Sequence, residues 1–244
     1  MYAQRKTTLT HMALSDKETE IAKTLMAGKD ATVCMVSARA EDLGGRVYNK
    51  KYTALGNCLA DMLGSLAYDV NISRMLTNGM LGPNSVAFHV MSRLKDDVAA
   101  CKGTRNDIFL PASNVFDTLP EKGVFGKEEL KRHVDSADNC RVVCRDIPEK
   151  NRRTGTRVAV AVADRRMIDA SDIALFVFEG FSKDEPEKKT HSKDMLRYAA
   201  KAGKLVIVAY MEDDGTFHGR VLPPDGKTVG AYYAQVCENV TCDF

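Results

Sequence analysis

The chain has 244 residues, of which 44% are hydrophobic and 28% are charged, and its formal net charge is only +2. This balance is typical of a globular protein that can bury a full core, and it does not require a nucleic-acid or membrane partner. No stretch of the sequence reaches 18 consecutive apolar residues, so we expect no membrane span and a cytoplasmic location.

The seven cysteines are odd in number and scattered, which favours reduced thiols over a disulfide framework. Cys140 and Cys144 are four residues apart and Cys237 and Cys242 five, but no histidine accompanies either pair at a zinc-site spacing. Of the five dispersed histidines, only His191 lies in an expected ligand loop, and there a solvated side chain is the simpler interpretation. We therefore expect neither a metal nor a cofactor.

Residues 1–30 are expected to form a helical extension. Ser15-Asp-Lys-Glu18 fits a capping box, and a short amphipathic helix follows and ends at Gly28. Residues 212–244 contain turn signals such as Pro-Pro-Asp-Gly, which predict a hairpin-like appendage.

Between these extensions, residues 31–211 alternate short apolar runs with helical patterns. Strands are predicted at 31–36, 71–76, 107–111, 141–144, 173–178 and 205–210, and helices at 52–66, 86–94, 126–137, 156–170 and 193–202. The region 156–170 also permits a strand, but a helix there supplies the crossover to the strand at 173–178. Residues 145–157 are expected to form a solvated loop or a lid. The pattern predicts an α/β fold, Rossmann-like and doubly wound, with a mainly parallel sheet and helices on both faces.

In such a sheet, ligands bind outside the carboxyl ends of the strands, where the strand order reverses. The loops expected there are 37–45, 77–84, 111–116 and 179–194. Gly79 and Gly82 permit a tight turn, and Pro83 near the first helical position suits a helix N-terminus that meets an anion. A plain strand-to-helix connection with two turn glycines accounts for the same residues.

With these loops, residues 31–210 resemble the SLOG superfamily of Rossmann-like proteins, which includes DNA-processing protein A and the lonely-guy phosphoribohydrolases. Ser37-Ala-Arg39, Thr77-Asn-Gly-Met-Leu-Gly-Pro-Asn84 and Arg165-Arg-Met-Ile-Asp-Ala-Ser-Asp172 carry the resemblance. It implies a pocket for a nucleotide or related phosphate-bearing ligand. The residues that it assigns to ligand binding are Ser37, Arg39, Thr77, Asn78, Gly79, Gly82, Asn84, Arg165, Arg166, Asp169, Asp172, Thr190 and Ser192.

Within this resemblance, Arg39 and one of Arg165 or Arg166 would contact the phosphate or base, because a guanidinium can bind bidentately or stack. Asp169 and Asp172 would hold the arginines or touch a sugar hydroxyl. Two simpler interpretations stay open. The four-residue spacing of Arg165 and Asp169 fits a surface ion pair, and Asp172 fits a cap between helix and strand.

The chain departs from the family where the glycosidase members carry a catalytic glutamate. Thr190-His-Ser-Lys-Asp194 replaces a glycine-containing turn, and the glutamate position falls at Met195, which can act neither as nucleophile nor as general base. Glu179 and Asp194 are the carboxylates left for catalysis at a glycosidic bond.

Three functions remain open, and whether the chain is an enzyme is undecided. Binding of a nucleotide-type ligand, for sensing or sequestration, is favoured by the phosphate-loop features and the missing glutamate. The alternative is an N-glycosidase or glycosyl transferase that acts on a nucleoside monophosphate through Glu179 or Asp194. Single-stranded nucleic-acid binding is less favoured by the low net charge; it would use Arg39, Arg152, Arg153, Arg165, Arg166, Tyr48 and Tyr52. Self-association through the apolar helix at 52–66 is also expected, although the same side chains fit a core.

Overall fold

The computed structural model describes residues 13–36, 49–80, 82–119, 126–178, 191–211 and 215–224. Its strands are β1 (Ala31–Met35), β2 (Ile72–Thr77), β3 (Arg105–Ala112), β4 (Asn139–Cys144), β5 (Ile173–Phe178), β6 (Leu205–Met211) and β7 (Phe217–Leu222). They form one sheet in the order β4-β3-β2-β1-β5-β6-β7. All neighbouring pairs are parallel except β6 and β7. The strand order reverses between β1 and β5.

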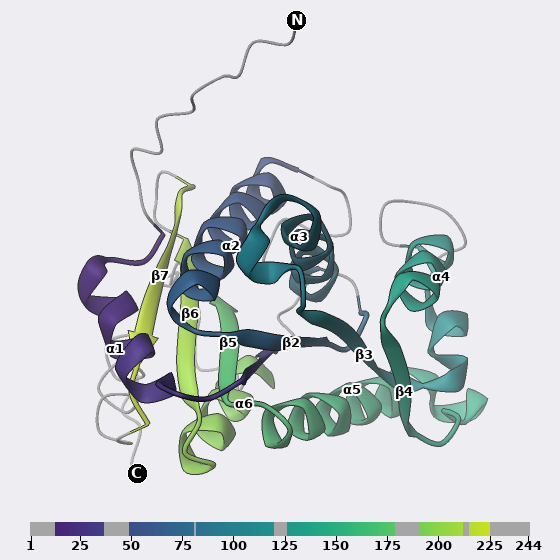
Figure 1. Ribbon diagram of the computed structural model, residues 1–244. Helices are drawn as coiled ribbons and strands as arrows, with labels where there is room; N and C mark the ends of the chain where they lie inside the picture. The colour runs from purple at the N-terminus through teal and green to yellow at the C-terminus, as the bar shows by residue number, and fades with distance from the viewer. Residues whose placement is uncertain are drawn as a thin grey trace, which may run out of the picture.

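Helices cover both faces of the sheet (Figure 1). They are α1 (Asp16–Met26), α2 (Lys50–Asp69), α3 (Pro83–Asp97), α4 (Lys127–Ser136), α5 (Arg152–Asp169) and α6 (His191–Lys201), with 3-10 turns η2 (Ala99–Cys101), η3 (Ser113–Thr118) and η4 (Glu149–Asn151). α1, α2 and α3 share one apolar cluster with the sheet, and α5 and α6 share another on the opposite face. This arrangement confirms the α/β, Rossmann-like prediction, including the helix expected before β5.

Helix α2 is the largest contributor to the first cluster. Its apolar side chains repeat at helical spacing, and Leu55, Leu59, Met62, Leu63 and Leu66 are all fully buried. Burial of one such side chain stabilises a fold by about 1.5–3 kcal/mol. The stripe that was considered for self-association is therefore core.

Several element boundaries differ from the sequence prediction, and two of them lie near the carboxyl ends of the strands. β3 does not end at Pro111 but continues to Ala112. Leu110 pairs with Val142 and Ala112 with Cys144, so Pro111, which lacks an N–H, lies between two paired residues. The loop expected at 145–157 is shorter, since α5 already begins at Arg152 after η4.

The two ends of the described chain pack together. The predicted capping box of α1 is present, with the Ser15 and Glu18 side chains each accepting from the other's backbone N–H. Gly219 on β7 donates to the Ala13 carbonyl at 2.6 Å. β7 pairs antiparallel with β6 and forms an edge of the main sheet, so this part of the predicted appendage belongs to the sheet itself. Residues 225–244 lie outside the described part of the chain.

Within the described residues, no helix combines the length and apolar character needed to cross a membrane.

A buried ion pair joins β2 and β3. Asp107 is fully buried, and its Oδ2 accepts from Arg74 Nε at 3.1 Å and from Arg74 Nη2 at 2.6 Å. Arg105 is a weaker partner, with Nη2 at 3.5 Å from Oδ1.

We expect Arg74→Ala to lower the free energy of unfolding by about 3 kcal/mol, because it strands a buried charge. The control is Lys23→Ala, which removes an exposed pair with Asp69 and should cost at most about 1 kcal/mol. Urea denaturation measures both. Equal losses in the two variants would mean that Arg105 alone compensates Asp107.

Candidate functional site

A fully buried carboxylate, Asp164 of α5, lies at the carboxyl end of β2. Its Oδ1 accepts from Asn78 Nδ2 at 2.8 Å, and its Oδ2 lies 2.6 Å from His191 Nε2. Asn78 directly follows β2, and His191 opens α6, the helix that follows β5 in the chain. The contact therefore joins segments from both sides of the point where the strand order reverses.

The contact with Asp164 orients the His191 ring. An ionised carboxylate only accepts hydrogen bonds, so Nε2 is the donor whenever Asp164 is charged. The His191 side chain is 29% exposed. The interpretation of His191 as a solvated loop histidine is wrong, because it is a helical residue held by a buried acid.

The glycine turn after β2 has the backbone that the sequence predicts. Gly79 and Gly82 have φ of +69° and +94°, and Pro83 is the first residue of α3. Asn78 Oδ1 accepts from the Met80 N–H at 2.9 Å. Such positive φ angles strongly favour glycine.

The two asparagines of the turn hold it in place. Asn84 Oδ1 accepts from the Asn78 N–H at 3.0 Å, and both side chains are buried. Thr77, also fully buried, precedes them, and its Oγ1 has no hydrogen-bond partner among the described residues. The structure thus brings Thr77, Asn78, Gly79, Gly82 and Asn84 together, with the asparagine side chains engaged in shaping the turn.

The third segment of the resemblance does not join this turn. Asp172 precedes β5 and accepts from the Thr32 N–H at 2.9 Å, at the amino edge of the sheet. Asp169 accepts from the Tyr198 hydroxyl at 2.7 Å, which raises the pKa of that tyrosine, and Arg165 lies 5.6 Å over the same ring. These residues and the exposed Arg166 approach the amino edge because α5 runs opposite to the strands.

The structure therefore corrects one expectation. The residues expected around the ligand loop lie near the amino edge of the sheet instead: Arg165, Arg166, Asp169 and Asp172. The simpler interpretation of Asp172 as a junction residue fits its hydrogen bond to Thr32. Arg165 and Asp169 do share one helix face, as their spacing predicts, but they meet at Tyr198.

The remaining expected site residues belong to the loops or to α6. Ser192 is buried in the first turn of α6 beside His191, whereas Asp194 is exposed. Met195, at the position where the resemblance would place a glutamate, packs in the core between the sheet and α6. Ser37, Arg39, Glu179 and Thr190 lie outside the described residues.

Cys34 on β1 lies near Asp164 but is not a candidate nucleophile. Burial raises the pKa of its thiol to about 12, and the Ser171 hydroxyl lies 3.3 Å from its sulfur. A thiol must ionise to attack or to bind a metal. Cys34 is thus a packing residue at neutral pH.

Sequence reasoning did not single out Asp164 and assigned His191 to a solvated loop. In α5, helical periodicity alone does not decide which stripe faces the sheet. The buried positions are Ala159, Ala163, Asp164, Met167 and Ile168, and Val158 is 58% exposed. The one available signal was that Asp164 shares a helical stripe with Met167 and Ile168.

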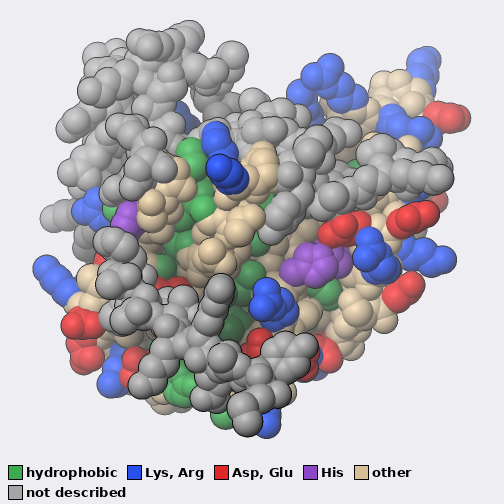
Figure 2. Space-filling view, turned by 90° about the horizontal axis from the view of Figure 1, so that it is seen from above, with side chains coloured by type: hydrophobic (Ala, Val, Ile, Leu, Met, Phe, Trp, Pro, Cys, Tyr) green, Lys and Arg blue, Asp and Glu red, His purple; other side chains and the backbone are tan. Residues whose placement is uncertain are grey.

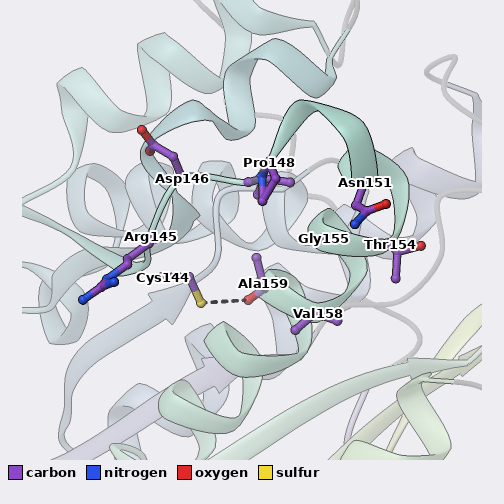
Figure 3. A pocket seen from close by; sticks show the side chains of 10 residues that line it. Cys144, Arg145, Asp146, Pro148, Asn151, Thr154, Gly155, Val158 and Ala159 are labelled. Atoms are coloured by element: carbon purple, nitrogen blue, oxygen red, sulfur yellow. Dashed lines mark hydrogen bonds between the residues drawn. The ribbon is translucent and has the colours of Figure 1, made fainter.

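A separate hollow of about 550 Å³ lies between the end of β4 and the first turns of α5 (Figure 3). The charged side chains of Arg145 and Asp146 lie on one side of it, away from Asn151 and Thr154 (Figure 3). Its polar groups do not converge as they do around Asp164, so the carboxyl end of β2 is the better candidate site.

The surface charge bears on nucleic-acid binding. On the face seen in Figure 2, basic side chains of the described residues are interspersed with acidic ones and form no continuous stripe. Arg152, one of the arginines considered for this role, is engaged with the Asp117 carbonyl at 3.3 Å and with Glu149 at 3.7 Å. A protein that binds single-stranded nucleic acid requires a continuous basic groove that follows the phosphate backbone.

No protein-family model matches this chain, and no curated protein matches it either. The SLOG resemblance stays an expectation that rests on three short segments. Function therefore has to be inferred from the geometry of the site.

We expect Gly79→Ala to lower the free energy of unfolding by about 2–5 kcal/mol, from backbone strain and overpacking together. An added Cβ would lie 2.8 Å from Leu130 Cδ1 and 3.3 Å from Ile108 Cγ2. Gly203→Ala is the matched control, because Gly203 has φ +66° but open space around a Cβ, and should cost about 1–2 kcal/mol. Equal costs, measured by urea denaturation, would show that packing around the turn is loose.

Proposed function

We propose that the chain binds a nucleotide or a nucleotide-derived phosphate ligand at the carboxyl ends of β1, β2 and β5. The observation that carries the proposal is the glycine turn after β2, which leads directly into the N-terminus of the 15-residue helix α3. Backbone amides and the helix dipole make such an end favourable for a phosphate group. The turn also lies beside β1, where the strand order reverses.

The Asp164 network supports the proposal by fixing the turn. Asn78 is held on three sides, by Asp164, by Asn84 and by the Met80 N–H. A turn that is ordered before the ligand arrives loses little conformational entropy on binding. Ligand contacts would then come from backbone groups of the turn and from His191.

Binding without turnover is favoured over catalysis by Met195. It occupies the position where the resemblance expects a glutamate, and it is 2% exposed in the core. Asp194, the next residue upstream, is exposed in the first turn of α6. We infer a sensor or a sequestering protein as the first candidate function.

Thermal stabilisation by a panel of nucleoside mono-, di- and triphosphates and cyclic nucleotides tests this proposal. A ligand at a hundred times its Kd should stabilise the fold by about 2.7 kcal/mol. Asn84→Ala should weaken this stabilisation, because it releases the Asn78 N–H from its partner. Asp169→Asn, on the same helix as Asp164 but bonded to Tyr198, should not.

No stabilisation by any nucleotide would contradict nucleotide binding. Stabilisation that is unchanged in Asn84→Ala would place the ligand elsewhere on the chain.

A second candidate function, cleavage or transfer at the N-glycosidic bond of a nucleoside monophosphate, is favoured by the Asp164–His191 pair. A buried carboxylate that orients a partly exposed imidazole is the arrangement of a general acid or base. Glu179 or Asp194 would supply the carboxylate that an oxocarbenium-like transition state requires.

If the wild-type protein releases free base from a stabilising nucleotide, His191→Gln should slow that release by about 10²–10⁴-fold, since glutamine cannot exchange protons. Chromatography of the ligand measures the release, and Asp169→Asn is again the control. Recovery of every stabilising nucleotide intact would exclude this second function, and a full rate in His191→Gln would remove the histidine from it.

A further inference from the structure

A second group of polar side chains lies on the far side of the glycine turn from Asp164. His89 comes from α3, and Glu129 and His133 come from successive turns of α4. His89 Nε2 lies 3.0 Å from Glu129 Oε1 and 3.0 Å from His133 Nε2, and the distance from His133 Nε2 to Glu129 Oε1 is 3.6 Å. One potential ligand atom from each side chain therefore lies within 4.8 Å of the other two.

Ordinary two-centre hydrogen bonds do not satisfy all of these contacts. A ring nitrogen has a single in-plane direction, which carries either one proton or one lone pair. His89 Nε2 can thus make only one ordinary two-centre hydrogen bond, although it lies at 3.0 Å from two atoms. A cation at the centre of the three atoms would instead let them all present lone pairs to the same point.

The distances fit a small transition-metal ion. Nitrogen and carboxylate ligands bind Zn²⁺ at about 2.0–2.2 Å, so two ligands of a tetrahedral ion lie about 3.3–3.5 Å apart. The three separations here, 3.0, 3.0 and 3.6 Å, fall around that value. We propose that His89, Glu129 and His133 bind a divalent transition-metal ion of the Zn²⁺ type.

The surroundings hold these side chains in place. The His133 ring is buried in the core. The other carboxylate oxygen of Glu129, Oε2, lies 3.7 Å from Arg132 Nη2, which leaves Oε1 to face the centre. The His133 ring is fixed by Phe88, with ring centroids 4.8 Å apart.

Three protein ligands leave one coordination position. His133 and Glu129 are buried, whereas the His89 side chain is 56% exposed. The centre therefore opens to solvent beside His89, where water or an exogenous ligand completes the coordination.

The ion would clamp α3 to α4 beside the glycine turn. Leu130, next to Glu129 in α4, is the residue whose Cδ1 a Cβ at Gly79 would meet at 2.8 Å. The bound ion would thus hold in place the helix that packs against the turn. Metal binding here does not depend on which ligand the turn binds.

Titration of the metal-free full chain with Zn²⁺ by calorimetry, and with Co²⁺ by the visible absorption of four-coordinate cobalt, tests the site. We expect one high-affinity ion per chain and a higher Tm with Zn²⁺. His89→Ala, which changes a half-exposed side chain, should keep the fold and weaken the affinity by about 100-fold or more. His218→Ala on β7 is the matched control and should bind like the wild type.

Loss of the cobalt spectrum in His89→Ala with retention in His218→Ala supports the site. Absence of zinc binding, or equal affinity in the wild type and His89→Ala, would overturn the proposal. In the second case the ion binds elsewhere, for example at the exposed Cys140.

Discussion

The buried carboxyl group of Asp164 is the constraint on which the polar end of the sheet depends. A carboxylate that is removed from water costs several kcal/mol unless donors compensate it. Asn78 and His191 are its hydrogen-bond partners, and they come from opposite sides of the strand-order reversal. The position of α5 therefore decides where the glycine turn and the start of α6 lie relative to each other, although Asn78 and Asp164 are 86 residues apart in the chain.

The glycine turn lies between two polar groups, the Asp164 network and the cluster of His89, Glu129 and His133. On one side, Asp164 holds the turn through Asn78. On the other, α4 packs Leu130 against Gly79 and carries two of the three proposed metal ligands. Both groups use side chains that are expensive to leave unpaired in a core. A ligand at the turn would therefore meet a backbone that is already ordered, because the side chains of Asn78 and Asn84 shape it.

The rotation of α5 against the sheet shows where sequence reasoning ends. The helix has valines and alanines around most of its circumference, so periodicity allows more than one inward stripe. Val158 is exposed whereas Ala159 and Ala163 are buried, since small residues let the helix approach the sheet closely. The same rotation buries Asp164 and leaves Arg165 and Asp169 outside, where they meet Tyr198.

The sequence by itself determined the fold class, the strands and helices, the capping box at Ser15 and the positive φ angles of Gly79 and Gly82, because periodicity, caps and turn chemistry are local properties. Only the tertiary structure decided which residues meet. The Asp164 network and the cluster of His89, Glu129 and His133 join segments that lie 27 to 86 residues apart. The direction of α5 sent its last turn to the amino edge, and no local pattern encodes the direction or rotation of a helix against a sheet.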